Sequence, residues 1–580
     1  MTRVWRRGVE HVRTGPFLIT LLASLPMLWS SLRGIRAGWF PLGDEALTGL
    51  SAFDVFTGHP PVMGPRTTTA FETGIESHHP GPLLYYLLAP TSALADGAPW
   101  GLIVGSAIIT LLIIALGVHA ADRLGGPLMA TAIGCAFLGV QWALGPEAGA
   151  RPFNPYPPAF ALLTFLVLTW ALLDERLEYT PHYVAVTSVM LQGHVGYLPF
   201  VAGPLVVLAV VGLFRWARRR RTIWPLKGWR PQDDGHFRWP VRGAALVGLL
   251  VWTPPAIELF RFSPNNLQQI LAYIGADRGE PIPALTALRF VVGLVGPVPG
   301  GMAAAVNGAD HVGAHMTPPS TSVTGTVVGL LLLVLVLAMS VLAGSRRVRR
   351  SVPDTARRWL PSRRESRAAG VALIGFAALS VTVTRLPVSS AQSSWNYLQA
   401  WPVVFFIWSV LVAYGARLIL VHLHMARGRL QHVAALLLVS AMLAALMSPA
   451  PTRWHEGDGV AAGMDALRDH LAKIQSHHQG RLHVTFDGDT LGAGYYVAPA
   501  LAHAIKADYA VHLPAVWQGS EDTDFRKSVT APEDTAWVSI RAGRKTTLPQ
   551  DVNERSVAVT TVTDSNGHDY TLFVRGPNPS

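Results

Sequence analysis

The chain has 580 residues, of which 50% are hydrophobic and only 14% are charged, and its mean hydropathy is +0.32. A soluble protein of this length is normally about one quarter charged, so the composition predicts an integral membrane protein. The net charge of +11 does not indicate a nucleic-acid partner. Its basic residues lie in short blocks between apolar segments, as expected for cytoplasmic loops. The single cysteine, Cys135, excludes an intrachain disulfide or a zinc–cysteine site.

Apolar runs that meet or approach the roughly 17–25 residues of a membrane-spanning helix recur along the chain and predict about eleven transmembrane helices. They lie near residues 15–33, 101–119, 127–145, 158–173, 181–195, 197–214, 241–257, 322–344, 369–386, 401–420 and 430–449. The first run has no small-residue cleavage site, so we interpret it as a retained helix rather than a signal peptide. The neighbouring runs 181–195 and 197–214 could also form one tilted helix.

Basic segments fix the expected orientation. Residues 215–242 and 345–367 are rich in arginine and predict cytoplasmic loops, with the amino terminus on the same side. The first outer loop then covers residues 34–100, and the carboxyl terminus is extracytoplasmic. High use of Ala, Arg and Gly with little Lys is typical of a high-GC bacterium, so the expected location is a bacterial plasma membrane.

Two apolar segments do not fit the count of crossings. Residues 80–95 are predicted to form an interfacial or re-entrant helix within the first outer loop. Residues 290–306 are interrupted by Gly and Pro and are predicted to remain on the outer side without crossing.

A second domain is predicted after residue 453. Residues 1–453 form the expected transmembrane domain, whereas residues 454–580 have the composition of a small extracytoplasmic α/β domain, with 16 acidic and 11 basic side chains over 455–580. Hydrophobic periodicity predicts its elements. Helices are expected over 464–474 and 496–507, and strands over 482–486, 536–540, 556–562 and 570–574.

An acidic pair, Asp44 and Glu45, opens the first outer loop just after an aromatic and basic segment. Such a pair could take a proton from an acceptor hydroxyl, or could hold a divalent cation such as Mg²⁺ or Mn²⁺ against a phosphate leaving group. Alternatively, Asp44 serves only as the N-cap of the helix that follows, over residues 45–56.

A histidine pair, His78 and His79, precedes Pro80 at the entry to the apolar segment Leu83 to Leu88. Imidazoles at this point could contact a lipid phosphate at the membrane interface. The alternative is that they only mark a boundary between polar and apolar sequence.

These features together resemble the GT-C glycosyltransferases: a first transmembrane helix, Gly43-Asp44-Glu45 at the start of a long outer loop, and His79-Pro80-Gly81 leading into Leu-Leu-Tyr-Tyr-Leu-Leu. That superfamily includes protein mannosyltransferases, aminoarabinose transferases and arabinofuranosyltransferases. The resemblance covers the layout of roughly residues 1–260. It implies a GT-C-like helical fold, a polyprenyl-phosphate sugar donor and Asp44 as catalytic base, with Glu45 beside it. The family pattern His-Pro-Pro is His-Pro-Gly here, which puts the match of this helix entry in doubt.

Other polar residues of the outer face are candidates for binding either substrate. A bidentate contact with the donor phosphate is expected from Arg151, which lies beside Phe153 and Tyr156, although it could also be an ordinary interfacial arginine. His194, in the Gln-Gly-His step of an apolar stretch, is a second candidate for contact with the donor phosphate. Hydrogen bonding between helices is an equally good interpretation of this residue. The further donor candidate is Arg261. The predicted contacts to the acceptor are Glu76, Asn154, Gln192, Arg385, Trp395 and Asn396.

The functional hypotheses are therefore two. The first is an inverting transferase that moves a sugar from a polyprenyl-phosphate donor to a glycan, lipid or protein acceptor of the cell envelope. The second is a non-enzymatic translocator of lipid-linked glycans or an envelope-assembly component. The predicted spans carry no Asp, Glu or Lys away from their ends, which disfavours ion-coupled transport. The absence of Walker and dinucleotide-binding loops disfavours a nucleotide-sugar donor.

Overall fold

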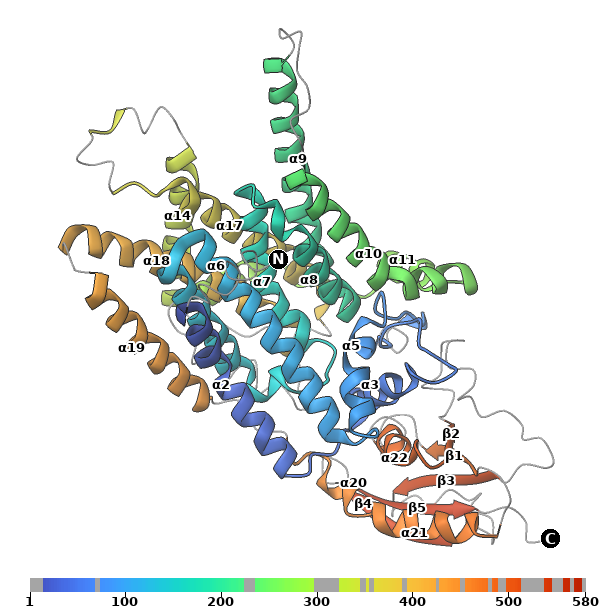
Figure 1. Cartoon of the computed structure of the whole chain (residues 1–580). Helices are drawn as coiled ribbons and strands as arrows, with labels where there is room; N and C mark the ends of the chain where they lie inside the picture. Colours follow the sequence, from blue (N-terminus) through green and yellow to red (C-terminus); the bar gives the residue numbers. More distant parts are fainter. Residues whose placement is uncertain are drawn as a thin grey trace, which may run out of the picture.

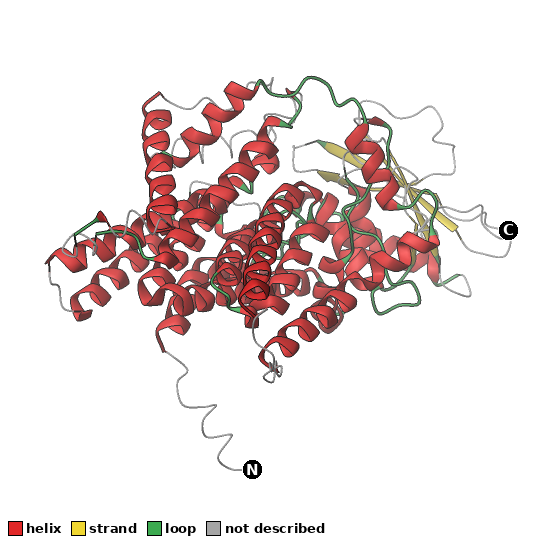
Figure 2. Ribbon diagram, turned by 90° about the horizontal axis from the view of Figure 1, so that it is seen from above, coloured by secondary structure: helices red, strands yellow, loops and turns green. Residues whose placement is uncertain are grey.

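The structure is a computed structural model of the whole chain. It describes residues 14–67, 73–223, 235–296, 323–344, 351–353, 359–388, 394–423, 427–448, 454–477, 482–488, 497–512, 537–544, 557–563 and 568–575. A large bundle of helices forms most of the molecule, and a small sheet with its own helices lies against one end of the bundle (Figure 1). Figure 2 shows the strands gathered at one edge of the molecule.

All eleven predicted apolar runs are helical in the structure. They form α2 (Thr14–Arg36), α6 (Pro99–Leu144), α7 (Tyr156–Leu173), α8 (Thr180–Gly193), α9 (Leu198–Ile223), α10 (Gly235–Arg261), α14 (Val323–Gly344), α17 (Arg363–Thr384), α18 (Ala400–Leu423) and α19 (Arg427–Leu446). Two predicted runs are joined in the 46-residue α6, where Gly126 breaks the helical dihedrals with φ of 73° just before Pro127. The runs at 181–195 and 197–214 are two helices rather than one, because the 3₁₀ turn Val195–Tyr197 separates α8 from α9.

Eight of the described helices are long and apolar enough to cross a membrane, which supports a multi-pass protein without confirming eleven crossings. The 80–95 segment forms α5 (Leu83–Leu94), a 12-residue apolar helix too short for an ordinary crossing. The beginning of the 290–306 segment lies in α12 (Ala284–Val295), and residues 297–306 lie outside the described part of the chain.

Helix α7 lies at the centre of the bundle. It is hydrophobic on every side, and α6, α8, α9, α17 and α18 all pack against it. Its Phe160, Phe165 and Trp170 are buried in the main core of the molecule. The loops at its two ends are thereby fixed at opposite ends of the bundle.

The carboxy-terminal region folds as the predicted small α/β domain. Five strands form one sheet in the order β2-β1-β3-β5-β4, with β1 parallel to β2 and β3, and the remaining pairs antiparallel. The strands are β1 (His483–Gly488), β2 (Ala510–His512), β3 (Trp537–Arg544), β4 (Val557–Thr563) and β5 (Asp569–Arg575), and the helices are α20 (Asp458–Ala461), α21 (Met464–Gln475) and α22 (Ala498–Ile505). Strand β2 was not predicted, because three residues are too few to show alternation.

One helix of the segment between α2 and α6 is shared between the two parts of the molecule. Helix α3 (Gly43–Asp54) places Leu42, Ala46 and Leu50 in the core of the carboxy-terminal domain and packs against α22. A Cβ at Gly49 would lie 2.5 Å from the buried ring of His503 in α22. The helix that carries Asp44 and Glu45 is therefore fastened directly to the α/β domain.

Candidate functional site

The acidic pair lies in the first turn of α3. Gly43 has φ of 47°, a left-handed conformation that a residue with a side chain adopts only with strain. The N-cap position is Leu42, so Asp44 lies inside the first turn rather than at the cap. Negative side chains are favoured there by the partial positive charge of the helix N-terminus. Asp44 is half-buried, whereas Glu45 is buried.

Glu45 is engaged by Arg151 from the loop before α7. Arg151 Nε donates to Glu45 Oε1 at 2.6 Å, and Nη2 donates to Glu45 Oε2 at 2.8 Å. This is the bidentate geometry in which a guanidinium and a carboxylate match best. Two residues predicted as separate parts of a catalytic site thus form one buried ion pair.

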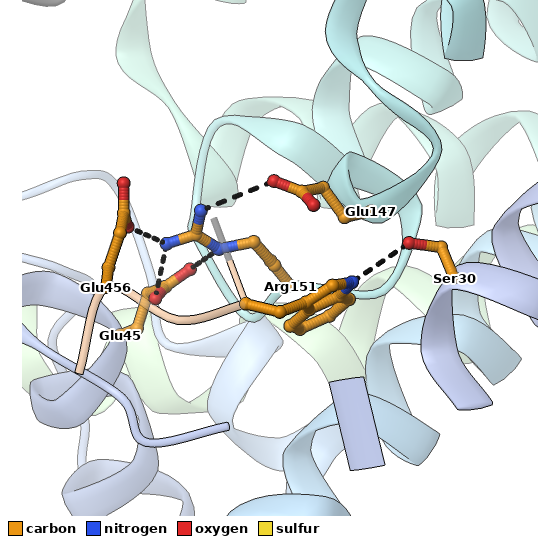
Figure 3. A network of polar contacts seen from close by, with 6 residues as sticks. Ser30, Glu45, Glu147, Arg151 and Glu456 are labelled. Atoms are coloured by element: carbon orange, nitrogen blue, oxygen red, sulfur yellow. Dashed lines mark hydrogen bonds and ion pairs between the residues drawn. The ribbon is translucent and has the colours of Figure 1, made fainter. Parts of the chain in front are cut away.

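Two further carboxylates surround the same guanidinium (Figure 3). Arg151 Nη2 donates to Glu456 Oε2 at 3.0 Å, and Glu147 Oε1 lies 3.8 Å from Nη1. Glu147 lies in the 3₁₀ turn Pro146–Gly149, one helical turn before Arg151. We refer to Glu45, Glu147, Arg151 and Glu456 as the arginine cluster.

Electrostatics keep Arg151 charged despite its burial. Burial alone would lower its pKa, but the neighbouring charge of Glu45, its hydrogen bonds and the charge of Glu456 together hold the pKa of Arg151 above its ordinary value. Three carboxylates surround one guanidinium, so the cluster has an excess of negative charge when all are ionised.

Glu456 reaches the cluster on the segment that enters the carboxy-terminal domain. Trp454 fixes this segment to α2, because its Nε1 donates to Ser30 Oγ at 3.0 Å and its ring packs edge-on against Trp39. A Cβ at Gly34 of α2 would lie 2.7 Å from the Trp454 ring, so a side chain at this position would clash with the indole.

The predicted histidines also meet. The rings of His79 and His194 lie 4.6 Å apart between centroids, and His79 Nδ1 accepts a hydrogen bond from Val195 N at 3.2 Å. Asn266, at the start of α11 (Asn266–Gly275), accepts from His78 N at 2.8 Å and donates to His78 O at 3.1 Å. We refer to His78, His79 and His194 as the histidine cluster.

The two neighbouring histidines, His78 and His79, are neutral at ordinary pH. Burial, together with the charge of Arg66, lowers the pKa of His78 to about 4. Burial is the largest cause that holds the pKa of His79 well below its usual range, and the electrostatic effects of His194 and His78 lower it further. Because His79 Nδ1 accepts a hydrogen bond, the proton of the neutral ring is on Nε2, where it can be donated.

Asn154 and Gln192 hold the surroundings of the histidine cluster. Asn154 Nδ2 donates to Gly193 O at 3.0 Å, which joins the loop of Arg151 to the turn before His194. Gln192 Oε1 accepts from Leu83 N at 3.1 Å, at the start of α5. A Cβ at Gly81 would lie 2.3 Å from this amide oxygen, so the glycine that departs from the His-Pro-Pro pattern makes room for Gln192.

The remaining predicted residues have surroundings of their own. Glu76 forms an ion pair with Arg66 at 3.1 Å, and the Arg261 guanidinium lies over the ring of Phe262. Arg385 is exposed at the end of α17. Trp395 and Asn396 lie in the 3₁₀ helix Ser394–Tyr397, where the side chain of Trp395 is outside the described structure.

An apolar groove opens between α2 and α6 at the end of the bundle that bears the arginine cluster. Its volume is about 230 Å³, and it is lined by Leu28, Ser31, Leu32, Ile35, Val104, Ala107, Ile108 and Leu111. The lining is almost entirely hydrocarbon, so the groove suits an alkyl or isoprenoid chain rather than a sugar.

A divalent cation at Asp44 and Glu45 does not fit this arrangement well. Both carboxylate oxygens of Glu45 accept hydrogen bonds from Arg151. Among the described residues, no group of three or more His, Cys, Asp or Glu side chains is arranged to hold a metal ion. We derive no step through a metal.

The sequence alone did not identify Glu147, Trp454 or Glu456 as residues of the site. Glu147 lies four residues before Arg151, a spacing that brings side chains together on a helical turn and could have indicated the pair. Glu456 is separated from Arg151 by 305 residues, and no local pattern connects them.

Comparisons with known proteins return no matching family model and no matching curated protein. Among solved structures, ArnT from Cupriavidus metallidurans in the apo state matches with a TM-score of 0.43 and 14% identity, over 98% of this chain and all of that one. The same protein bound to undecaprenyl phosphate gives 0.42 and 14% over the same shares. The Archaeoglobus fulgidus oligosaccharyltransferase, in complex with Zn and sulfate, gives 0.36 and 12% over 88% of this chain and 67% of that one.

All three matches lie below 25% identity and below a TM-score of 0.5. At such identities and TM-scores they carry no inference about substrate or mechanism, which must come from the residues of the site.

Proposed function

We propose that the chain is a membrane glycosyltransferase that moves a sugar from a polyprenyl-phosphate donor to an acceptor hydroxyl of the cell envelope. The observation that carries this proposal is the pairing of an acidic helix N-terminus with a buried arginine. Asp44 and Glu45 open α3, and Arg151 holds Glu45 from the loop before α7. The proposed base is thus the sequence neighbour of the carboxylate that holds the proposed cationic group for phosphate.

The proposed reaction is a single displacement. The Asp44 carboxylate accepts the proton of the acceptor hydroxyl, and the resulting oxygen attacks the anomeric carbon. The bond from that carbon to the phosphate oxygen breaks, its electron pair stays on the phosphate, and polyprenyl phosphate leaves. A positioned base contributes about 10²–10⁴ in rate. The configuration at the anomeric carbon is inverted.

The structure supports different roles for the two acidic residues. Glu45 is buried and uses both oxygens to hold Arg151, so we assign it to positioning the arginine. Asp44, on the same turn, is half-buried, so we assign it as the base. Arg151 would stabilise the negative charge that develops on the leaving phosphate.

The histidine cluster is proposed to assist at the phosphate. Neutral His79 offers an Nε2 proton as a hydrogen-bond donor, without adding charge. Donor contacts from His78, His194 and Arg261, and acceptor contacts from Glu76, Asn154, Gln192, Arg385, Trp395 and Asn396, remain predictions.

The lipid chain of the donor is proposed to lie in the apolar groove between α2 and α6. Ser31 and Ile35 of this groove lie close in sequence to Ser30 and Gly34, which contact Trp454 beside Glu456. The sheet domain would then face outside the cell, with the amino terminus in the cytoplasm. Its packing on α3 suits it to position an acceptor near Asp44.

The test is transfer by purified protein in lipid nanodiscs, with radiolabelled polyprenyl-phosphate sugars offered one at a time together with membrane-derived acceptors. We expect transfer from one donor, and its loss in Asp44→Asn. Glu178→Gln, which changes a carboxylate that is 60% exposed and pairs with Arg176, is the matched control and should transfer normally. Binding of a donor without transfer to any acceptor would favour the translocator hypothesis.

A further inference from the structure

The two edges of the Arg151 guanidinium are not equally occupied. The edge formed by Nε and Nη2 is filled by both oxygens of Glu45. On the edge formed by Nη1 and Nη2, Nη2 donates to Glu456, whereas Nη1 is buried and has no hydrogen-bond partner among the described residues. Glu147 Oε1, at 3.8 Å, is beyond hydrogen-bond range of Nη1. A second acceptor oxygen is therefore missing on this edge.

The three carboxylates also differ in how firmly they are held. The side chains of Glu45 and Glu147 are 6% and 5% exposed, whereas that of Glu456 is 33% exposed. Glu45 accepts two hydrogen bonds from Arg151 and Glu456 accepts one. Glu456 is the carboxylate that can turn towards solvent at the smallest cost, because its side chain is the most exposed of the three.

The charge of the arginine cluster determines which group can replace the Glu456 carboxylate. An anion added to three carboxylates would be repelled, but an anion that replaces one of them is not. A phosphodiester carries one negative charge, as a carboxylate does, and it presents two oxygens that match the Nη1 and Nη2 edge. It would keep the charge of the cluster and give Nη1 its missing acceptor.

We propose that Glu456 occupies, in the substrate-free protein, the edge of Arg151 that the phosphate of the lipid-linked donor takes on binding. This inference rests on the proposed function, because it identifies where the donor phosphate binds and what it displaces. Glu456 is a positioning residue that holds Arg151 ready and leaves when the phosphate arrives.

The exchange is local to the side chain. Trp454 is fixed to Ser30 and Trp39, and a Cβ at Gly457 would lie 2.3 Å from Phe40 O. The backbone on both sides of Glu456 is thus closely packed, so rotation of the side chain is the movement that remains. The segment that enters the carboxy-terminal domain would then change its contact with the site whenever donor binds.

The chain offers a matched control for charge. Asp458 lies two residues after Glu456, is 53% exposed and pairs with His455. Asp458→Asn removes the same charge as Glu456→Gln from almost the same place, without touching Arg151.

The experiment titrates a polyprenyl-phosphate sugar, which is a phosphodiester, into the full-length protein in nanodiscs and measures its Kd. We expect Glu456→Gln to tighten binding by roughly 3- to 10-fold, because the competing carboxylate is gone. Asp458→Asn should stay within about 2-fold of the unaltered protein. Arg151→Lys should weaken binding, because Lys cannot offer two parallel donors. Adding Glu456→Gln to Arg151→Lys should bring no further tightening, since the competition needs the guanidinium edge.

Several results would overturn the proposal. They are unchanged or weaker binding in Glu456→Gln, equal tightening in Asp458→Asn, tightening that persists with Arg151→Lys, and no binding in any variant. A parallel titration with inorganic phosphate separates the sources: tightening for the inorganic ion but not for the lipid would contradict a lipid headgroup at this edge. If the lipid binds as expected but no sugar is transferred, the proposed function fails and this inference stands.

Discussion

The two ends of α7 carry two charge clusters of opposite design. Before its first residue, Arg151 is surrounded by Glu45, Glu147 and Glu456. After its last residue, Asp174 forms ion pairs with Arg364 and Arg367 of α17. One end thus has one cation among three anions, and the other has one anion between two cations.

Burial separates the two clusters further. The side chains of Arg364 and Arg367 are 50% and 34% exposed, whereas that of Arg151 is 8% exposed, and one of its nitrogens lacks a hydrogen-bond partner within the described part of the chain. Water can screen the cluster at Asp174, which fastens α7 to α17. The cluster at Arg151 holds its charges away from water, where charges are costly unless they are paired and hydrogen-bonded.

The largest expected effect on stability comes from removing the cation of the buried cluster. Arg151→Ala leaves Glu45 and Glu147 buried without their counter-charge, and we expect a loss of about 3–5 kcal/mol in the free energy of unfolding. Arg364→Ala, at the half-exposed cluster, should cost about 0–1 kcal/mol. Denaturant titration in detergent measures both. Equal losses would show that the two clusters are alike.

A smaller effect is expected where α3 meets the carboxy-terminal domain. In Gly49→Ala the new Cβ would lie 2.5 Å from the ring of His503, and we expect a loss of roughly 1–3 kcal/mol from overpacking. Gly212→Ala in α9, where nothing lies within 4 Å, should instead be neutral or stabilising by up to about 1 kcal/mol. Unfolding monitored by limited proteolysis provides the comparison. Similar outcomes for both variants would mean that α3 is not held tightly against α22.

The smallest expected effect is a dependence of the free energy of unfolding on pH, through His503 at the contact between α3 and α22. Burial, together with the charge of Lys506, holds the pKa of His503 well below its ordinary value. Below about pH 6.5 the unfolded chain takes up a proton that the folded protein refuses, so the free energy of unfolding falls by up to about 1.4 kcal/mol per pH unit. Above that pH the stability is fully present. His78 and His79 contribute in the same direction.

His503→Leu should reduce this slope, because neither ring nitrogen has a hydrogen-bond partner among the described residues and only the titration is lost. His477→Gln, at an exposed position, should leave the slope as it is. A slope that is unchanged by His503→Leu would locate the titration elsewhere.

Local pattern was enough to predict most of the helices and the strands of the small domain. Apolar runs identify α2 and α7 because a membrane requires continuous hydrophobic sequence. The pairing of His79 with His194 and of Glu45 with Arg151 brings together residues that the sequence had singled out one by one. Which of them meet depends on packing between distant helices, and no periodicity records that packing. Glu456 was missed for the same reason, since only the docking of Trp454 on α2 brings it to Arg151.

The most direct test of the central claim is the rate of sugar transfer by Asp44→Asn in protein that folds and binds donor. We expect turnover to fall by at least about 10², with the Kd for the lipid donor largely unchanged, because the amide keeps the shape of the side chain and cannot accept the proton. Turnover equal to that of the unaltered protein would contradict the assignment of Asp44 as the base.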